Sequence, residues 1–354
     1  MSTTKAIVVL PEERAADIRM VPVPRIRDDW TLVRVKAMAL NPTDWKHIDY
    51  GYANAGARIG CEYAGVVTEV GANVTSVKVG DHVAGFCHGG HRSDHETGAF
   101  GEYILGKACG QIKMLADMSF EQAATLPISI FTCGLGLYKS LELPPPDRPA
   151  KEPFPILIHG GSTSTGMRAI QFAKASGLTV IATASPHNFD YLKSLGADAV
   201  FNYKSATCGL EIKSYTKNKL RYAWDCVGGG ETLCCQALSD VEPSKYGAIN
   251  ASNAPDPDLL KRTNQVVEGP FFVLAYNILN EEYEWQDQMI RPPNDEMEFA
   301  QSFKQLTLEL FEKGKLGFVN ISLNRGGSGL EGVMVGLDEM RAGRVSGEKL
   351  VYTF

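Results

Sequence analysis

Hydrophobic and polar positions follow different patterns in the two halves of the chain. In the first half, short apolar runs such as 31–40 and 63–70 are separated by glycine, proline and Asn-Asp signals, which predicts a β-rich fold. After Leu126-Pro127, a helical stretch leads into the proline-rich linker 144–149, which cannot lie inside a helix. The two halves are therefore expected to fold as separate units.

Beyond the linker, apolar strand-length runs alternate with segments of helical periodicity. The expected strands are 155–159, 179–184, 199–202, 222–226 and 246–251, with helices at 167–176 and 189–195 among them. Such alternation predicts a doubly wound parallel sheet. A long amphipathic helix is expected at 298–313, and a closing β segment that ends at Phe354 is expected to rejoin the first domain.

Composition agrees with a compact two-domain protein. A chain of 354 residues with 44% hydrophobic and 21% charged residues supports a large core. The net charge of −6 comes without long runs of one sign, which argues against nucleic-acid and membrane-surface binding. The apolar run 6–10 is too short for a signal peptide or a membrane span, and eight irregularly spaced cysteines form no disulfide framework. A cytoplasmic protein with reduced thiols is expected.

The turn after the first strand of the second half carries the clearest chemistry. His159 is followed by Gly160-Gly161-Ser162-Thr163-Ser164-Thr165-Gly166, where a helix is about to begin. Backbone N–H groups and hydroxyls at a helix N-terminus suit a pyrophosphate, although Ser and Thr replace part of the G-x-G-x-x-G fingerprint. An ordinary Ser/Thr helix cap is the alternative interpretation. The alternating pattern favours a dinucleotide site.

The end of the next strand indicates which dinucleotide. NAD-specific sites usually place Asp or Glu there to bind the ribose 2′-hydroxyl. This chain has Ser185-Pro186-His187-Asn188 instead, with Tyr203 and Lys204 after the following strand. Hydroxyl, imidazole and amide groups can bind a 2′-phosphate, so NADPH is favoured over NADH. The same residues also suit a helix cap and turn, and both roles can coexist.

Several motifs together resemble a known family. The segments 41–46, 60–65, 79–83 and 159–166 resemble the medium-chain dehydrogenase/reductase superfamily across essentially the whole chain. Within it, the chain is most similar to fungal trans-acting enoyl reductases that serve polyketide synthases, on segments 159–165, 185–190, 215–222 and 346–351. The resemblance implies an NADPH-binding Rossmann domain (130–279) inserted in a β-rich GroES-like catalytic domain (1–129 and 280–354).

The resemblance also implies which residues surround the ligands. Residues expected near NADPH are Thr43, Asp44, Trp45, Lys46, Ser162, Thr163, Ser164, Thr165, Ser185, Pro186, His187, Asn188, Tyr203, Asn250, Ala251, Ser346 and Gly347. Residues expected to line the substrate channel are Ile128, Ser129, Ile130, Phe131, Thr132, Cys133, Gly134 and Leu135.

No metal is expected. Zinc-dependent members of the superfamily place Cys where this chain has Asn41 and His where it has Cys61, so Glu62 alone cannot make a catalytic zinc site. The four-Cys structural zinc lobe is also missing. A second group of potential ligands has a spacing that matches no common metal motif; it consists of Cys87, His88, His91, Asp94 and His95.

Three residues are candidates for the chemistry of enoyl reduction. Lys46 is expected to hold the nicotinamide ribose or stabilise developing negative charge, unless it is only a surface lysine. Tyr52 is a candidate proton donor, since related zinc-free enoyl reductases carry a Tyr in such a loop, and packing is its alternative role. Thr132 is expected to bond the substrate carbonyl, unless it bonds back to its own helical turn.

Three functions remain open at this stage. The first is a reductase of α,β-unsaturated polyketide thioesters that acts in trans with a polyketide synthase. The second is a free-standing quinone or enone oxidoreductase, and the third is a protein that binds NADPH without turnover. Segment 269–274 is expected to form an edge strand for dimerisation or to border the nicotinamide. Relatives favour a monomer over a homodimer.

Overall fold

The computed structural model describes residues 2–11, 15–249, 264–285 and 288–354. The chain divides into two compact units. The first comprises Met1–Ile128, Tyr276–Gln301 and Asn320–Phe354, and the second comprises Ser129–Ala275 and Ser302–Val319. Over the described ranges, every helix is too short or too polar to cross a membrane.

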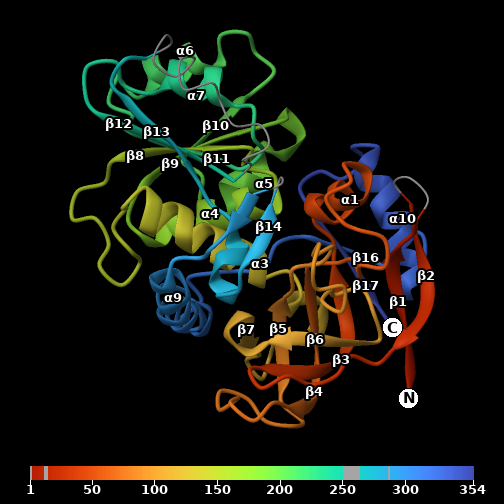
Figure 1. The fold of residues 1–354 in the computed structure, drawn as a ribbon. Helices are drawn as coiled ribbons and strands as arrows, with labels where there is room; N and C mark the ends of the chain where they lie inside the picture. The colour runs from red at the N-terminus through yellow and green to blue at the C-terminus, as the bar shows by residue number, and fades with distance from the viewer. Residues whose placement is uncertain (1, 12–14, 250–263, 286–287) are drawn as a thin grey trace. The chain divides into compact units, whose positions relative to one another are not determined.

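The first unit is built on a mainly antiparallel seven-stranded sheet in the order β16-β17-β3-β4-β5-β7, with β6 paired to β3 (Figure 1). The hairpin of β1 and β2 and that of β14 and β15 form two small additional sheets. The strands are β1 (Thr3–Val9), β2 (Ala16–Pro22), β3 (Trp30–Ala39), β4 (Glu62–Val70), β5 (His82–Phe86), β6 (Tyr103–Lys107), β7 (Gln111–Lys113), β14 (Tyr283–Trp285), β15 (Gln288–Ile290), β16 (Ile321–Leu323) and β17 (Lys349–Thr353).

Apolar side chains of β3, β4 and β17 form the core of this unit together with helix α10. Leu330, Val333 and Leu337 lie on one face of α10 at helical spacing and pack against Tyr352 of β17 within this core. The helical elements are α1 (Pro42–Asp49), η1 (Ala108–Gly110), α2 (Phe120–Ala123), η5 (Ala275–Leu279), α9 (Asn294–Glu312, partly in the second unit) and α10 (Gly329–Arg341).

The second unit contains a six-stranded sheet in the order β10-β9-β8-β11-β12-β13, and all its strand pairs are parallel. Figure 1 shows α4 and α5 on one face of this sheet and α6 and α7 on the other. Its strands are β8 (Pro155–His159), β9 (Thr179–Ala184), β10 (Ala199–Asn202), β11 (Tyr222–Asp225), β12 (Ser244–Ala248) and β13 (Val267–Phe272). The predicted doubly wound parallel sheet is thus confirmed.

The helical segments of the second unit lead into and connect these strands. They are α3 (Pro127–Cys133), the π-helical η2 (Gly134–Ser140), α4 (Ser164–Ala175), η3 (Pro186–Asn188), α5 (Phe189–Ser194), α6 (Cys208–Tyr215) and α7 (Glu231–Ala237). Residues buried on both sheet faces, such as Ile156, Leu157 and Ile158 of β8, explain why this strand is continuously apolar.

One predicted boundary is wrong. The sequence placed all of 280–354 in the first domain, but residues Ser302–Val319 pack with the second unit. The ring of Phe303 lies 5.1 Å from that of Phe172, and Arg168 donates a hydrogen bond of 3.0 Å to the carbonyl of Gly317. The periodicity of α9 predicts an amphipathic helix, but it does not show against which core the apolar face packs.

Candidate functional site

Helix α1 carries four of the residues expected near the cofactor. The motif that contains them was not predicted to be helical, but Pro42 occupies the first turn and the Asp44 carboxylate accepts a 2.6 Å hydrogen bond from the Asn41 N–H. Thr43, Trp45 and Lys46 are half-buried, whereas Asp44 is 1% exposed. Thr43, Trp45 and Lys46 thus remain partly accessible on this helix, whereas the Asp44 carboxyl lies in the protein interior.

Lys46 lies in a partly apolar setting. Its Nζ is 5.9 Å from the centre of the Trp45 ring, and burial lowers the pKa of the ammonium group. Within the described ranges it pairs with no carboxylate. A cation in this position can stabilise negative charge on a ligand.

A buried ion pair includes Glu62, which directly follows Cys61 and is hydrogen-bonded to Asn41, the two positions where zinc-dependent members of the superfamily have His and Cys ligands. Lys349 Nζ lies 2.7 Å from Glu62 Oε2 and donates a 2.5 Å hydrogen bond to Asn41 Oδ1. Asn41 Nδ2 in turn donates to Glu62 Oε2 at 2.9 Å, and the Ile128 N–H donates to Glu62 Oε1 at 2.6 Å. Both oxygens of Glu62 and the amide of Asn41 are thus occupied by protein groups.

Next to this pair, three acidic groups are buried together. Burial raises the pKa of Asp44 to about 7, and Asp44 Oδ1 accepts no hydrogen bond. Burial and the neighbouring Asp44 raise the pKa of the Cys61 thiol. Cys61 Sγ lies 3.5 Å from the hydroxyl of Tyr276, whose own pKa burial raises. Sequence reasoning did not identify Tyr276, because no motif spacing links residue 276 to residues 43 and 61.

Aromatic rings pack together near these groups. The Tyr52 ring centre lies 5.9 Å from that of His47 and 5.9 Å from that of Trp285. Tyr276 stacks on His88 at 3.9 Å with an interplanar angle of 8°. Burial lowers the pKa of His47 to about 4, so this imidazole is neutral at pH 7. The cluster offers an apolar, aromatic wall to a ligand.

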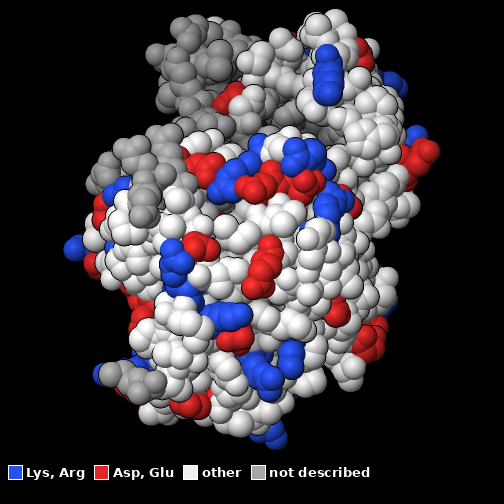
Figure 2. Space-filling model, turned by 90° about the vertical axis from the view of Figure 1, so that its right-hand side faces the viewer, with Lys and Arg blue, Asp and Glu red and all other residues white. Residues whose placement is uncertain are grey.

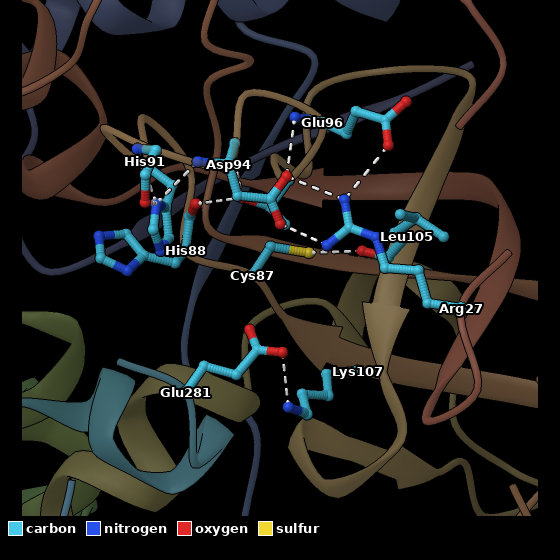
Figure 3. Close-up of polar contacts among 11 residues, drawn as sticks. Arg27, Cys87, His88, His91, Asp94, Glu96, Leu105, Lys107 and Glu281 are labelled. Carbon is cyan, nitrogen blue, oxygen red and sulfur yellow. Dashed lines mark hydrogen bonds and ion pairs between the residues drawn. The ribbon is translucent and has the colours of Figure 1, made fainter. Parts of the chain in front are cut away.

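The loop with the second group of potential metal ligands is held by protein contacts instead (Figure 3). Asp94 forms an ion pair with Arg27, and the Cys87 thiol donates to the carbonyl of Leu105 at 3.2 Å. His91 Nδ1 accepts hydrogen bonds from the N–H groups of Ser93 and Asp94. Across the described part of the chain, no group of three His, Cys, Asp or Glu side chains is arranged to hold a metal ion.

In the second unit, the turn between β8 and α4 has the geometry of a dinucleotide cradle. Gly160 has φ +72°, and a Cβ on Gly166 would lie 2.3 Å from the Gly160 carbonyl oxygen. Thr163 caps α4 by accepting a hydrogen bond from the Gly166 N–H. Ser164 Oγ is buried and has no protein partner, which leaves it available to a phosphate oxygen. Ser162 is half-buried, and Thr165 is 9% exposed.

Two residues that sequence reasoning missed hold this turn and the turn after the neighbouring strand β11. Thr183 Oγ1 accepts from the Gly160 N–H at 3.1 Å and bonds His159 Nδ1 at 2.9 Å. Asp225, at the end of β11, accepts from the N–H groups of Val227, Gly228 and Gly230 and from the Tyr246 hydroxyl. The signal that could have revealed Asp225 is a carboxylate near the end of a predicted strand, shortly before three successive glycines.

The residues expected at the 2′-phosphate follow β9 and β10. Ser185 is half-buried, Pro186 and His187 are exposed in η3, and Asn188 is buried. Tyr203 is 43% exposed, with Lys204 Nζ 5.9 Å from its ring centre. No Asp or Glu stands among residues 184–188, so the end of β9 offers only neutral side chains to a ribose.

The remaining predicted residues lie in three places. The expected channel residues fall on α3 and the start of η2, where all but Ile128 are buried; these are Ile128, Ser129, Ile130, Phe131, Thr132, Cys133, Gly134 and Leu135. Ser346 is exposed and Gly347 buried, just before β17. Asn250 and Ala251 lie outside the described residues.

Comparison with known proteins agrees with this division of the chain. Residues 27–117 match the alcohol dehydrogenase GroES-like domain, and residues 165–238 match the zinc-binding dehydrogenase domain. The fold is also that of CurK enoyl reductase, with a TM-score of 0.77, 19% identity and 99% of each chain covered. The quinone oxidoreductase from Coxiella burnetii gives a TM-score of 0.75 at 24% identity, with both chains covered completely.

Sequence relatives are more specific. Trans-enoyl reductase ACTTS2 of Alternaria alternata is 38% identical, with 99% of each chain covered. Trans-enoyl reductase TOXD of Cochliobolus carbonum is 40% identical over 86% of this chain and 99% of its own. The chain therefore belongs to the fungal trans-enoyl reductases, within the medium-chain dehydrogenase/reductase superfamily that its motifs resemble.

Proposed function

We propose that this protein is an NADPH-dependent enoyl reductase that reduces an α,β-unsaturated polyketide thioester in trans with a polyketide synthase. The observation that carries the proposal is the 38% identity to a trans-enoyl reductase over 99% of both chains. When bound, NADPH supplies a hydride to the β-carbon of the substrate. The protein binds and orients the reactants and manages the accompanying charge and proton.

The proposal assigns cofactor and substrate contacts residue by residue. Ser164 and the backbone of the β8–α4 turn are assigned to the pyrophosphate, because Ser164 Oγ is buried without a partner at a helix N-terminus. Ser185, His187 and Tyr203 are assigned to the 2′-phosphate, which supports NADPH over NADH. Lys46 is assigned to the nicotinamide ribose or to the developing enolate charge, and Thr132 to the substrate carbonyl.

The proposal assigns no zinc to the reaction. A catalytic zinc needs three deprotonated ligands, but the Cys61 thiol is held in its protonated form by burial, and Lys349 already neutralises Glu62. Turnover that survives dialysis against a zinc chelator is the expected result. Loss of turnover that returns with added Zn²⁺ would contradict this part of the proposal.

Location and oligomeric state belong to the same proposal. All eight cysteines are free, which supports a reducing compartment such as the cytoplasm.

The edge strand β13 includes Pro270, which has no N–H to offer a second copy, and Gly269 with φ +128°. These features of the edge support the proposed monomer. On the face seen in Figure 2, acidic and basic side chains lie next to one another, so the carrier partner is expected to dock without a single-sign patch there.

The decisive experiment follows NADPH absorbance with three substrates in parallel: an α,β-unsaturated pantetheine thioester, a simple enone and a quinone. Turnover of the thioester is the expected outcome. Turnover of the quinone or enone alone would favour a free-standing oxidoreductase. Saturable NADPH binding without turnover of any substrate would indicate a protein that binds the cofactor without chemistry.

A further inference from the structure

The hydroxyl of Tyr276 is fixed beside helix α1. It lies 3.3 Å from Oγ1 of Thr43 and 3.5 Å from Sγ of Cys61, and its ring is held by stacking on His88. Tyr276 is 8% exposed, so it is almost entirely packed. Thr43 and Lys46 belong to the same helix. A substrate that reacts beside α1 therefore has this phenol as a neighbour.

Behind Tyr276, further proton-bearing groups continue into the protein. Cys61 is 0% exposed and interacts with the Asp44 carboxyl, which has one oxygen without a hydrogen-bond partner. His47, the neighbouring imidazole, is committed elsewhere: its Nδ1 lies 2.8 Å from the Thr43 carbonyl, which can only accept, so Nδ1 donates there. Tyr276, Cys61 and Asp44 thus form a line of groups that can pass a proton.

We propose that Tyr276 donates the proton that enoyl reduction adds to the α-carbon, and that Cys61 and Asp44 return a proton to Tyr276. The inference rests on the proposed enoyl reductase function. Once the β-carbon has accepted a hydride, the electrons of the double bond reside on the thioester as an enolate. The Tyr276 O–H bond breaks, a C–H bond forms at the α-carbon, and the enolate electrons restore the carbonyl.

The return of the proton is balanced within the protein. The Tyr276 oxygen takes the proton of the Cys61 thiol, the sulfur takes that of the Asp44 carboxyl, and the Asp44 carboxylate then takes up one proton from the buffered solvent, so that each turnover consumes one solvent proton. Burial raises the pKa of Tyr276 and of Cys61, whereas that of Asp44 is about 7, so the Asp44 carboxyl is the strongest acid of the three and the source of the returned proton. The charged groups that act on Asp44 are Lys349 of β17, which favours its charge, and Glu62 of β4, which opposes it.

The test compares Tyr276→Phe with Tyr283→Phe. Tyr283 is a matched control: it is a buried phenol of the same unit, but its hydroxyl donates to Asn277 Oδ1 at 2.7 Å. Each protein reduces an α-methyl enoyl pantetheine thioester with NADPH in D₂O, and the face of α-deuteration is read by NMR. NADPH binding is measured separately by fluorescence, and melting curves establish that each variant is folded.

Tyr276→Phe is expected to lower kcat by about 10²-fold, as loss of a general acid does, with NADPH affinity unchanged and deuterium on both faces of the α-carbon. Tyr283→Phe is expected to keep the normal rate and to place deuterium on a single face of the α-carbon. Cys61→Ala is expected to slow turnover but to keep deuteration on a single face of the α-carbon. Cys61→Ser is expected to restore the rate.

Three results would overturn the proposal. The first is single-face deuteration by Tyr276→Phe at the normal rate, which leaves the enoyl reductase assignment intact. The second is equal loss of rate in Tyr276→Phe and Tyr283→Phe with a single face kept, which assigns Tyr276 a structural role. The third is failure of the unchanged protein to reduce any thioester, which removes the proposed function as well.

Discussion

The ammonium group of Lys349 lies 2.7 Å from the carboxylate of Glu62, and the two side chains are 4% and 0% exposed. A cation on β17 therefore neutralises a carboxylate on β4 that directly follows Cys61, the position where zinc-dependent members of the superfamily have a His ligand. Burying two charges is costly, and the pair is tolerated because Asn41 and the Ile128 N–H satisfy the remaining atoms.

Replacing one member of this pair is expected to destabilise the first unit. Lys349→Met leaves Glu62 buried without a counter-charge, which typically costs about 3–5 kcal/mol. The measurement is the midpoint of urea unfolding, monitored with a fluorescence probe in the first unit. The double variant Glu62→Met with Lys349→Met is the control, because it removes both charges. A midpoint as low in the double variant as in Lys349→Met would show that the ion pair is not the cause.

Asp44 is expected to make stability fall as pH rises. Its folded pKa of about 7 lies above the ordinary Asp value of 3.8, so between these values the folded protein binds more protons than the unfolded chain. The Asp44 contribution to the free energy of unfolding therefore decreases by up to about 1.4 kcal/mol per pH unit in this window and levels off above pH 7. Asp44→Asn should remove that component, since an amide does not titrate.

Urea midpoints from pH 4 to pH 8 measure this difference between the unchanged protein and Asp44→Asn. The difference itself isolates Asp44 from the other groups that titrate in the same range. Two parallel pH curves would mean that Asp44 already has an ordinary pKa in the folded protein.

The fold was largely predictable because its signals are local. The strands 155–159, 179–184 and 199–202 were predicted with the bounds that the structure has, since buried parallel strands are short apolar runs between turn residues. Helix α1 was missed because its residues were interpreted as a ligand-binding motif. For α9, the part from Ser302 onward was assigned to the other unit. The contact of Tyr276 with Thr43 joins positions 233 residues apart, and no local pattern encodes such a contact.

Gly166→Ala is expected to weaken NADPH binding by at least tenfold without unfolding the second unit. The new Cβ would lie 2.3 Å from the Gly160 carbonyl oxygen, so the β8–α4 turn must move away from α4. Titration of NADPH by fluorescence measures the change. Gly317→Ala is the matched control, because the atom nearest to its Cβ is 3.9 Å away. Unchanged affinity in Gly166→Ala would show that this turn does not bind the cofactor.

Ser185→Asp is expected to shift cofactor preference from NADPH toward NADH. A carboxylate after β9 repels the 2′-phosphate and can accept a hydrogen bond from a 2′-hydroxyl. The ratio of kcat/KM for the two cofactors should move by at least about tenfold, which corresponds to about 1.4 kcal/mol. Ser214→Asp, on the exposed side of α6, adds the same charge elsewhere and should leave the ratio unchanged. An equal shift in both variants would indicate a general charge effect.

Lys46→Met is expected to slow hydride transfer by about 10²-fold, because the variant loses a cation at the place where negative charge develops. Within the described ranges Lys46 pairs with no carboxylate, so its ammonium group is available to the ligand even though burial lowers its pKa. Stopped-flow loss of NADPH absorbance measures the step directly. Lys5→Met, at an exposed position of β1, controls for the change in net charge. Tyr52→Phe is expected to keep the normal rate, since Tyr276 rather than Tyr52 lies beside Cys61 and Thr43. A normal rate in Lys46→Met would remove this lysine from the mechanism and leave the enolate charge to other donors.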